Sequence, residues 1–333
     1  MITSVSVDDW KKYLTWNVLT STASKLSEEL EQENFAFFGT VLGGQQEMQP
    51  RWKRSLRSAN RYIGETVGQE FVKVAFSEDS KTRVNNMLDN IMVVLGDRIK
   101  GLEWMSEETK QEALKKLNSF GRKLGYPDVW QDYSKLAIER DSYVQNYLRV
   151  MRFESRKNLN KLGQPIDKTE WGMSPQMVNA YYHPLLNEVA FPAGILQPPF
   201  MDPEADDAVL YATIGAVIGH EITHGFDDSG ARFNAEGEMQ EQDLANFTER
   251  GDKVVEHFNK FEAMDSLFVN GELTLGENIA DFGGLTIAYY AYQKSLEGKE
   301  RIEIDGFSPE QRFFIAFGQV WQGNYTHEAL RQQ

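Results

Sequence analysis

The chain has 333 residues and no cysteine, so it can form no disulfide bond and offers no thiolate to a metal ion. It contains no run of 18 apolar residues, the length that a helix needs to span a bilayer. It also shows no signal peptide at Met1, an absence that says little if the sequence is an internal fragment. Histidine is scarce, with five residues in all. A metal site here must therefore use these few histidines together with carboxylates.

Positive charge is also in short supply. Lys and Arg number 35 against 50 Asp and Glu, and the formal net charge is −15. Phosphate binding requires clustered Lys and Arg, so we expect no nucleic-acid partner. The acidic balance is more typical of solubility than of a preference for cationic peptides. The apolar fraction of 41% is that of a globular protein, long enough for two domains with sizeable cores.

Two of the histidines lie four residues apart in the sequence HEITH at 220–224. On a helix, His220 and His224 project from the same face, so both imidazoles can reach one cation. Glu221 then lies beside the open coordination position. The alternative is an ordinary helix with two histidines on its polar face. The apolar run at 211–219 argues against it, because the helix is then buried and its polar side chains need partners.

A second motif supplies the missing carboxylates. A catalytic zinc takes three protein ligands and leaves the fourth position for water or substrate. We choose Glu277 as the ligand that joins His220 and His224, and we expect the three to converge in a desolvated cleft. Asp281, four residues further on, can accept the free ring N–H of a ligand histidine. One of the aspartates at 227–228 can do the same for His224, and the sequence does not decide which.

Four longer stretches, in this order along the chain, closely resemble the neprilysin family of zinc endopeptidases. They are VNAYY at 178–182, FPAGILQPPF at 191–200, GHEITHGFDD at 219–228 and LGENIAD at 275–281. The similarity runs from about Asp8 to the last residue. It implies a thermolysin-like catalytic domain joined to a mostly helical domain that roofs the active site. It also implies cleavage of short peptides on the amino side of bulky apolar residues.

The resemblance assigns the catalytic roles residue by residue. It implies that His220, His224 and Glu277 bind one zinc ion, that Glu221 is the general base, and that Asp281 is the partner of His220. In the expected mechanism, zinc lowers the pKa of its bound water towards 7 and polarises the scissile carbonyl. Glu221 then takes the water proton and later delivers it to the leaving amine.

The resemblance also implies a set of substrate contacts. Asn179 and Ala180 would bind the substrate backbone, and Val217, Val320 and Trp321 would line an apolar side-chain pocket. A strand edge here would let an extended peptide add to the sheet through main-chain hydrogen bonds, and the Asn179 amide offers both a donor and an acceptor. The alternatives are an asparagine that caps its own backbone and three residues of plain core.

Other features of the family have no counterpart here. In the family the chain continues beyond Gln333, with a histidine that stabilises the tetrahedral intermediate and an arginine that binds the substrate carbonyl. His327 lies in the wrong segment to replace that histidine, whose loss should cost on the order of 10²–10³ in rate. The N-terminal part of the helical domain is missing, and segment 237–242 is shorter than the family pattern. We therefore expect a fragment of about half the family's length.

Periodicity and punctuation predict a mainly α, α+β fold. Apolar residues at helical spacing predict helices in the first half over 8–38, 83–100, 107–120 and 139–161. We expect the apolar faces of these helices to form core. The second half should hold two short strands and then helices, at 177–182, 187–192, from Asp206 or Asp207 through the HEITH motif, around 277–281 and over 309–322. Gly215 and Gly219 predict close approach of another backbone. The expected domains are a partial helical domain with a linker, 1–160, and a C-terminally incomplete catalytic domain, 161–333.

Two other functions stay open. A zinc aminopeptidase shares HExxH and a distant Glu, but it would need an acidic recognition site where this chain has NAYY at 179–182. A peptide-binding module that no longer catalyses would explain the missing C-terminal chemistry. The expected partners are short peptides, and the oligomeric state does not follow from the sequence. Animal members are disulfide-bonded ectodomains, so the lack of cysteine suggests a bacterial relative of the periplasm or the exterior, with the cytoplasm left open.

Overall fold

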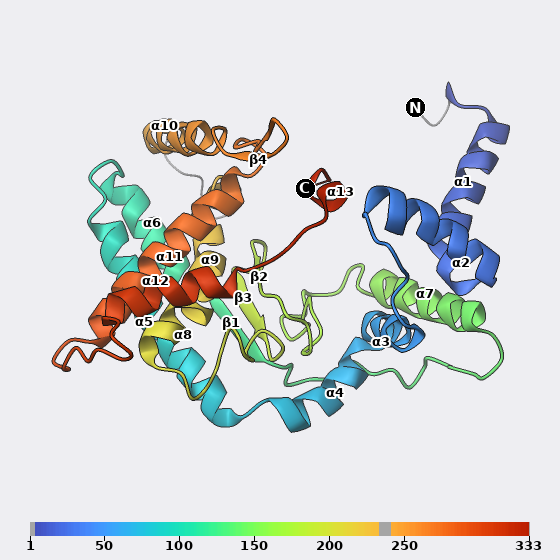
Figure 1. Ribbon diagram of the computed structural model, residues 1–333, viewed down its shortest axis with the longest axis horizontal. Helices are drawn as coiled ribbons and strands as arrows, with labels where there is room; N and C mark the ends of the chain where they lie inside the picture. The colour runs from blue at the N-terminus through green and yellow to red at the C-terminus, as the bar shows by residue number, and fades with distance from the viewer. Residues whose placement is uncertain (1–3, 233–240, 333) are drawn as a thin grey trace. The chain divides into compact units, whose positions relative to one another are not determined.

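The computed structural model describes residues 4–232 and 241–332 (Figure 1). The chain divides into two compact units. Unit 1 is Met1–Ile63, Trp130–Asp167 and Asn324–Gln333, and unit 2 is Gly64–Val129 and Lys168–Gly323. This division differs from a single boundary near residue 160, because residues 64–129 supply helices and a strand to unit 2. The expected shortening of segment 237–242 falls largely on residues 237–240, which lie outside the described residues.

Unit 1 is helical, and a serine begins its first helix. The Ser6 hydroxyl accepts a hydrogen bond from the backbone N–H of Asp9, which satisfies one of the free donors at a helix N-terminus. The elements of the unit are α1 (Val7–Thr22), η2 (Ala23–Lys25), α2 (Glu28–Asn34), η3 (Phe35–Leu42), α3 (Arg51–Tyr62), α7 (Tyr143–Asn160) and α13 (His327–Leu330).

The core of unit 1 is small. Among its described residues, Thr22, Ala23 and Val150 are buried. The prediction that the apolar face over 8–38 forms core is wrong, since Leu14 is 56% exposed and Val18 is exposed too. Helical spacing identifies an apolar face, but it does not tell whether another element covers that face.

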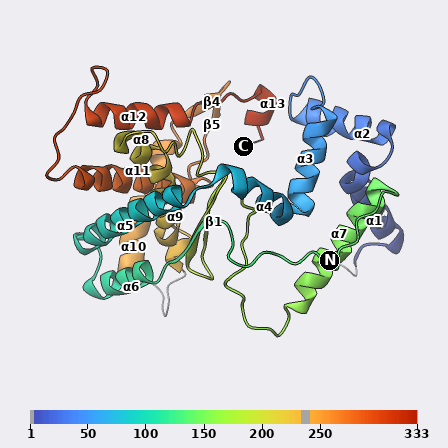
Figure 2. The ribbon, with the colours of Figure 1, turned by 90° about the horizontal axis from the view of Figure 1, so that it is seen from below.

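Unit 2 contains the larger set of elements (Figures 1 and 2). Its helices are α4 (Gly64–Ala75), α5 (Glu78–Lys100), α6 (Glu107–Asn118), α8 (Asp207–Ala212), α9 (Ile214–Thr223), α10 (Glu241–Phe258), α11 (Leu275–Ser295) and α12 (Pro309–Val320), with short 3₁₀ turns η4 (His224–Phe226) and η5 (Gly230–Arg232). The mainly α, α+β prediction is confirmed. Within the described residues, no helix is both long and apolar enough to cross a membrane.

A three-stranded sheet lies in unit 2, in the order β1 (Gly121–Gly125), β3 (Glu188–Pro192) and β2 (Tyr181–His183). β1 runs parallel to β3, with Leu124 opposite Phe191, and β2 runs antiparallel to β3, with Tyr182 opposite Val189. The predicted hairpin of β2 and β3 is confirmed. β1 is a strand that the sequence did not predict, because its partner lies far along the chain. A separate hairpin joins β4 (Glu262–Met264) to β5 (Leu267–Phe268).

One continuous core holds unit 2 together, with fully buried side chains from α5, α8, α9, α11, α12 and the sheet. The Asp206 carboxylate caps α8 by accepting from the N–H groups of Ala208 and Val209, as the predicted start requires. The expected single helix is broken at Thr213, whose φ of −98° and ψ of −91° are not helical. The Thr213 hydroxyl donates to the Phe200 carbonyl at 2.5 Å, so the break is tied to the preceding loop.

Candidate active site

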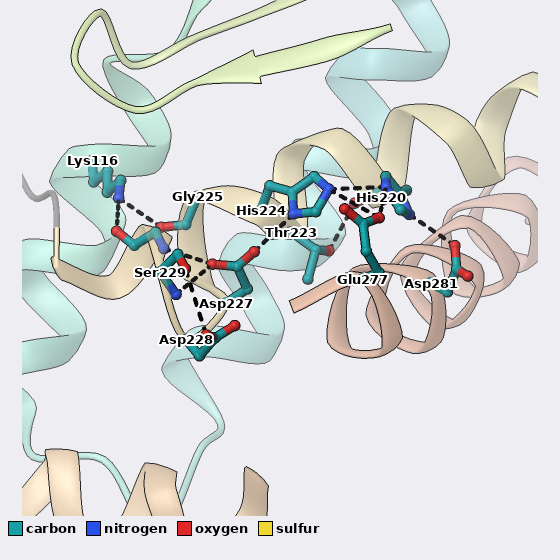
Figure 3. Close-up of polar contacts among 12 residues, drawn as sticks. Lys116, His220, Thr223, His224, Gly225, Asp227, Asp228, Ser229, Glu277 and Asp281 are labelled. Carbon is teal, nitrogen blue, oxygen red and sulfur yellow. Dashed lines mark hydrogen bonds and ion pairs between the residues drawn. The ribbon is translucent and has the colours of Figure 1, made fainter. Parts of the chain in front are cut away.

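Three donor atoms converge between α9 and α11 (Figure 3). The Nε2 atoms of His220 and His224 lie 2.9 Å apart. Oε2 of Glu277 lies 3.4 Å from the first of these nitrogens and 3.7 Å from the second. Donors bound at about 2.0–2.1 Å to a tetrahedral zinc ion are roughly 3.3 Å from one another. The triangle therefore fits a single ion of that size, with room for a fourth ligand.

A carboxylate holds the back of each imidazole. Nδ1 of His220 lies 2.8 Å from Oδ1 of Asp281, and Nδ1 of His224 lies 2.7 Å from Oδ2 of Asp227. These contacts favour the tautomer in which Nδ1–H donates to the carboxylate, so the Nε2 lone pair points to the common centre. The choice that the sequence left open between residues 227 and 228 is settled in favour of Asp227.

Asp227 is buried in the turn that follows α9. Its Oδ1 accepts hydrogen bonds from the backbone N–H groups of Ser229 at 2.9 Å and Gly230 at 2.6 Å. Burial alone would raise the pKa of Asp227, but the hydrogen bonds from His224, Gly230 and Ser229 outweigh it and lower that pKa. Burial would likewise lower the pKa of His224, yet the bond to Asp227 and the nearby carboxylates raise it. The Asp227 carboxylate is therefore a charged acceptor for the His224 ring N–H.

Glu221 is buried on α9 beside the same centre. Burial raises the pKa of its carboxyl group, and the Glu277 carboxylate adds to this effect, while the two imidazoles oppose it. The backbone N–H of Tyr182 in β2 also donates to Glu221 and lowers the pKa. A divalent cation at the three donors would add a further lowering effect. The carboxylate is thus positioned between the metal-binding triangle and the edge strand.

Glycine contacts between α9 and α11 bring these groups together. A Cβ atom built on Gly219 would lie 2.5 Å from the carbonyl oxygen of Gly284, a distance that real Cβ atoms do not show. The two backbones therefore touch at Gly219, and the close approach predicted for that residue is confirmed. Gly215 lies against the Leu210 carbonyl of α8 instead. Because α11 is held this close to α9, its first two turns carry Glu277 to the histidines.

The exposure of the carboxylates differs from the prediction. The side chain of Glu277 is 69% exposed and that of Asp281 is 62% exposed, whereas the two imidazoles are largely buried. The expected desolvated cleft is therefore wrong for the acidic half of the site in this chain. The reason is that the first turns of α11 lie at the surface of unit 2.

The residues predicted to contact substrate occupy several parts of unit 2. Asn179 is exposed and Ala180 is buried, directly before the edge strand β2. Val217 belongs to the buried core of the unit. Val320 is half-buried at the end of α12, and the exposed ring of Trp321 packs edge-on against Phe200.

The sequence missed two groups near the site. The backbone N–H of Tyr182 leaves no signal in a sequence, since every residue except proline has such a group. Lys116 on α6 did leave a signal, because it stands at helical spacing with the buried residues Thr109 and Phe120, where an apolar residue is expected. Its ammonium group donates to two carbonyls of the turn that contains Asp227.

Comparison with known families matches residues 1–127 and 179–333 to two models, each described as peptidase family M13. The chain belongs to peptidase family M13. Among curated M13-like relatives, the endothelin-converting enzyme homolog of Locusta migratoria is 38% identical over 96% of this chain and 46% of its own length. Human neprilysin is 35% identical over 98% of this chain and 46% of its own length. The predicted resemblance to neprilysins is confirmed.

Solved structures agree with this membership. The zinc metalloprotease Zmp1 of Mycobacterium tuberculosis, in complex with an inhibitor, is 41% identical with a TM-score of 0.93, covering 98% of this chain and 51% of that one. PepO from Lactobacillus rhamnosis is 29% identical with a TM-score of 0.87, covering 99% of this chain and 52% of that one. The M13 chain described here thus spans about half the length of the relatives that it matches.

Proposed function

We propose that this chain carries the zinc site of a metalloendopeptidase that hydrolyses short peptides. The observation that carries the proposal is the convergence of two imidazole nitrogens and one carboxylate oxygen within 4.8 Å of one another. His220, His224 and Glu277 would hold the ion and leave a position open, as catalytic zinc sites do. Asp281 and Asp227 would keep the two rings in the tautomer that binds metal. The name of the similar solved protein Zmp1 supports zinc as the metal.

Zinc held by these ligands would polarise the scissile carbonyl and lower the pKa of a bound water. Glu221 would act as the general base that accepts a proton from the attacking water and then delivers it to the leaving amine. The backbone N–H of Tyr182 donates to the Glu221 carboxylate and so fixes its orientation.

The edge strand β2 supports the substrate part of the proposal. β2 is one of the two outer strands of its sheet, so an extended peptide can add beside it through main-chain hydrogen bonds. Asn179 and Ala180 would meet the peptide backbone there. A bulky apolar side chain of the substrate would contact Val217, Val320 and Trp321. If this side chain belongs to the residue that supplies the nitrogen of the cleaved bond, cleavage falls on the amino side of that residue.

Glu221→Gln provides the direct test. In the zinc-loaded chain, it should keep wild-type zinc content by elemental analysis and lower the rate of peptide cleavage by about 10²–10⁴-fold, because a neutral amide cannot take a proton. Glu204→Gln, at an exposed position away from the centre, is the matched control and should cleave at the wild-type rate. Equal rates for wild type and Glu221→Gln would remove Glu221 from the mechanism.

The substrate distinguishes an endopeptidase from an aminopeptidase. We expect an N-acetylated peptide and its free-amine counterpart to be cut at the same internal bond and at similar rates. Cleavage of only the free-amine peptide would favour an aminopeptidase. Stoichiometric binding of both peptides at full zinc occupancy, without product, would favour a binding module. The bacterial periplasm or exterior as the compartment stays a prediction.

A further inference from the structure

Lys116 on α6 is a lysine where a core residue would be expected. It is 3% exposed, whereas lysine is almost never fully buried without a partner. Its Nζ donates to the carbonyl of Gly225 at 2.6 Å and to the carbonyl of Gly230 at 2.8 Å (Figure 3). An apolar side chain of similar length would fill the same space without the cost of burying a charge. The two hydrogen bonds are therefore what the ammonium group adds.

The two carbonyls belong to the turn that holds Asp227. Gly225 precedes this aspartate and Gly230 follows it, and the N–H of Gly230 donates to its carboxylate. The turn is tightly closed, because a Cβ atom on Gly230 would lie 1.8 Å from the carbonyl oxygen of His224. Lys116 thus joins both ends of the turn. Within this turn, Asp227 is the charged residue whose side chain forms a hydrogen bond with His224.

Charge adds to the geometry. Burial lowers the pKa of Lys116 to about 8, and the negative charge of Asp227 opposes that shift. The Asp227 carboxylate accepts the Nδ1–H of His224 and the two backbone N–H groups of Ser229 and Gly230, so its place depends on the shape of the turn that Lys116 joins.

A second path leads from Lys116 to the edge strand. The aromatic rings of Tyr182 and Phe226 lie 5.8 Å and 5.5 Å from its ammonium group. The Asn187 amide donates to the Lys116 carbonyl at 3.0 Å and accepts from the Tyr182 hydroxyl at 3.0 Å. Because the N–H of Tyr182 donates to Glu221, these contacts link Lys116 to the strand residue that also holds Glu221.

We propose that Lys116 is a positioning residue for the metal centre, which holds the 225–230 turn closed so that Asp227 meets Nδ1 of His224. It touches neither metal nor substrate, and it acts through Asp227. The inference rests on the proposed function, since it concerns the same centre. It adds a group on α6, outside the motifs that carry the ligands.

Zinc itself is the probe, so that the readout does not depend on turnover. Competition with a chromophoric chelator gives the zinc affinity of the wild-type chain and of Lys116→Met, which keeps the stem and removes the ammonium. We expect a loss of 10–100-fold, the range for removing the partner of a ligand histidine. Asp227→Asn should show a similar loss, and the double variant Lys116→Met/Asp227→Asn should lose no more than Asp227→Asn alone.

Lys123 is a matched control. It is a half-buried lysine of unit 2, and its Nζ lies 2.7 Å from Glu188 and 2.6 Å from the Glu170 carbonyl. Lys123→Met removes a largely enclosed ammonium whose hydrogen bonds go to Glu188 and Glu170 and not to the 225–230 turn. It should destabilise the fold while leaving the zinc affinity within about twofold of wild type.

The absence of cysteine allows a chemical rescue. Lys116→Cys introduces a single thiol, which can be alkylated with 2-bromoethylamine in the unfolded chain before refolding. The product restores an amine at nearly the length of lysine, and we expect it to recover most of the zinc affinity. Alkylation with iodoethane, which adds an apolar group, should not. The wild-type chain carried through the same procedure shows the effect of refolding.

Three outcomes would overturn the inference. The first is wild-type zinc affinity in Lys116→Met, and the second is additive losses of affinity in the double variant. The third is that the alkylated Lys116→Cys chain folds only when the amine is restored, because the loss of zinc affinity would then reflect unfolding of the whole chain. Failure of the proposed function looks different, because then the wild-type chain itself binds no zinc at these residues.

Discussion

The contact between Gly219 and Gly284 makes a sharp prediction about how packing controls the metal centre. In Gly219→Ala, the new Cβ atom would lie 2.5 Å from the Gly284 carbonyl oxygen and 2.8 Å from its Cα, all backbone atoms that no rotamer change can move. Ordinary contact begins at 3.4 Å, so α9 and α11 must separate by about 0.9 Å.

The size of the effect follows from two opposing contributions. Overpacking of this kind costs about 1–3 kcal/mol, and the better helix propensity of alanine returns about 0.5–1 kcal/mol. We therefore expect a net loss of up to about 2.5 kcal/mol in the free energy of unfolding. Glu277 belongs to α11 and would move with it. Metal–ligand bond lengths tolerate a deviation of only about 0.2 Å. A displacement of this size should lower the zinc affinity by at least tenfold.

Gly318 in α12 is the matched control, because a Cβ atom there would meet nothing within 4 Å. Gly318→Ala should gain about 0.5–1 kcal/mol and leave zinc binding unchanged. Urea unfolding and chelator competition on the two variants measure both quantities. If Gly219→Ala were as stable as Gly318→Ala and bound zinc like the wild type, the glycine contact would not set the position of α11.

Three further predictions follow from particular side chains. Asp281→Asn should lower zinc affinity by 10–100-fold in chelator competition, since the amide holds the His220 ring less well, while Asp252→Asn on the exposed face of α10 should not change it. Leu88→Ala, in the core of unit 2, should cost about 2–5 kcal/mol in urea unfolding and Leu14→Ala, on an exposed face, less than about 0.5 kcal/mol; equal losses would contradict the assigned cores. The pKa of Lys116 falls from 10.5 to about 8 on folding. Between pH 8 and pH 10.5, Lys116 is therefore protonated in the unfolded chain and neutral in the folded chain. The stability of the wild type relative to Lys116→Met should therefore rise from pH 8 to pH 10.5, and a fall would show that the pKa is not lowered.

Local patterns in the chain carried most of the site. The spacing of His220 and His224 places both rings on one face of any helix, whatever the helix packs against. The cap at Ser106 and the start of α8 at Asp206 also follow from side chains that satisfy the nearest backbone N–H groups. Glu277 was chosen as the third zinc ligand because it stands four residues before Asp281, and the resemblance to the neprilysin family implies the same role.

Other features depend on partners that are distant in the sequence. β1 could not be recognised, because a five-residue strand is defined by its pairing with β3. The choice of Asp227 was equally hidden, since residues 227 and 228 are chemically identical and the path of the turn decides which one faces His224. The prediction of core over 8–38 failed for the same reason, as exposure of Leu14 depends on what covers α1.

The amino-acid order by itself thus determined which groups can bind a metal and on which helical face they stand, because these properties depend on neighbours within one or two turns. The tertiary structure decided the distance between α9 and α11, through the meeting of Gly219 with Gly284, and the orientation of His224, through a turn held by Lys116. Both depend on contacts between segments that only the folded chain brings within a few ångströms of each other.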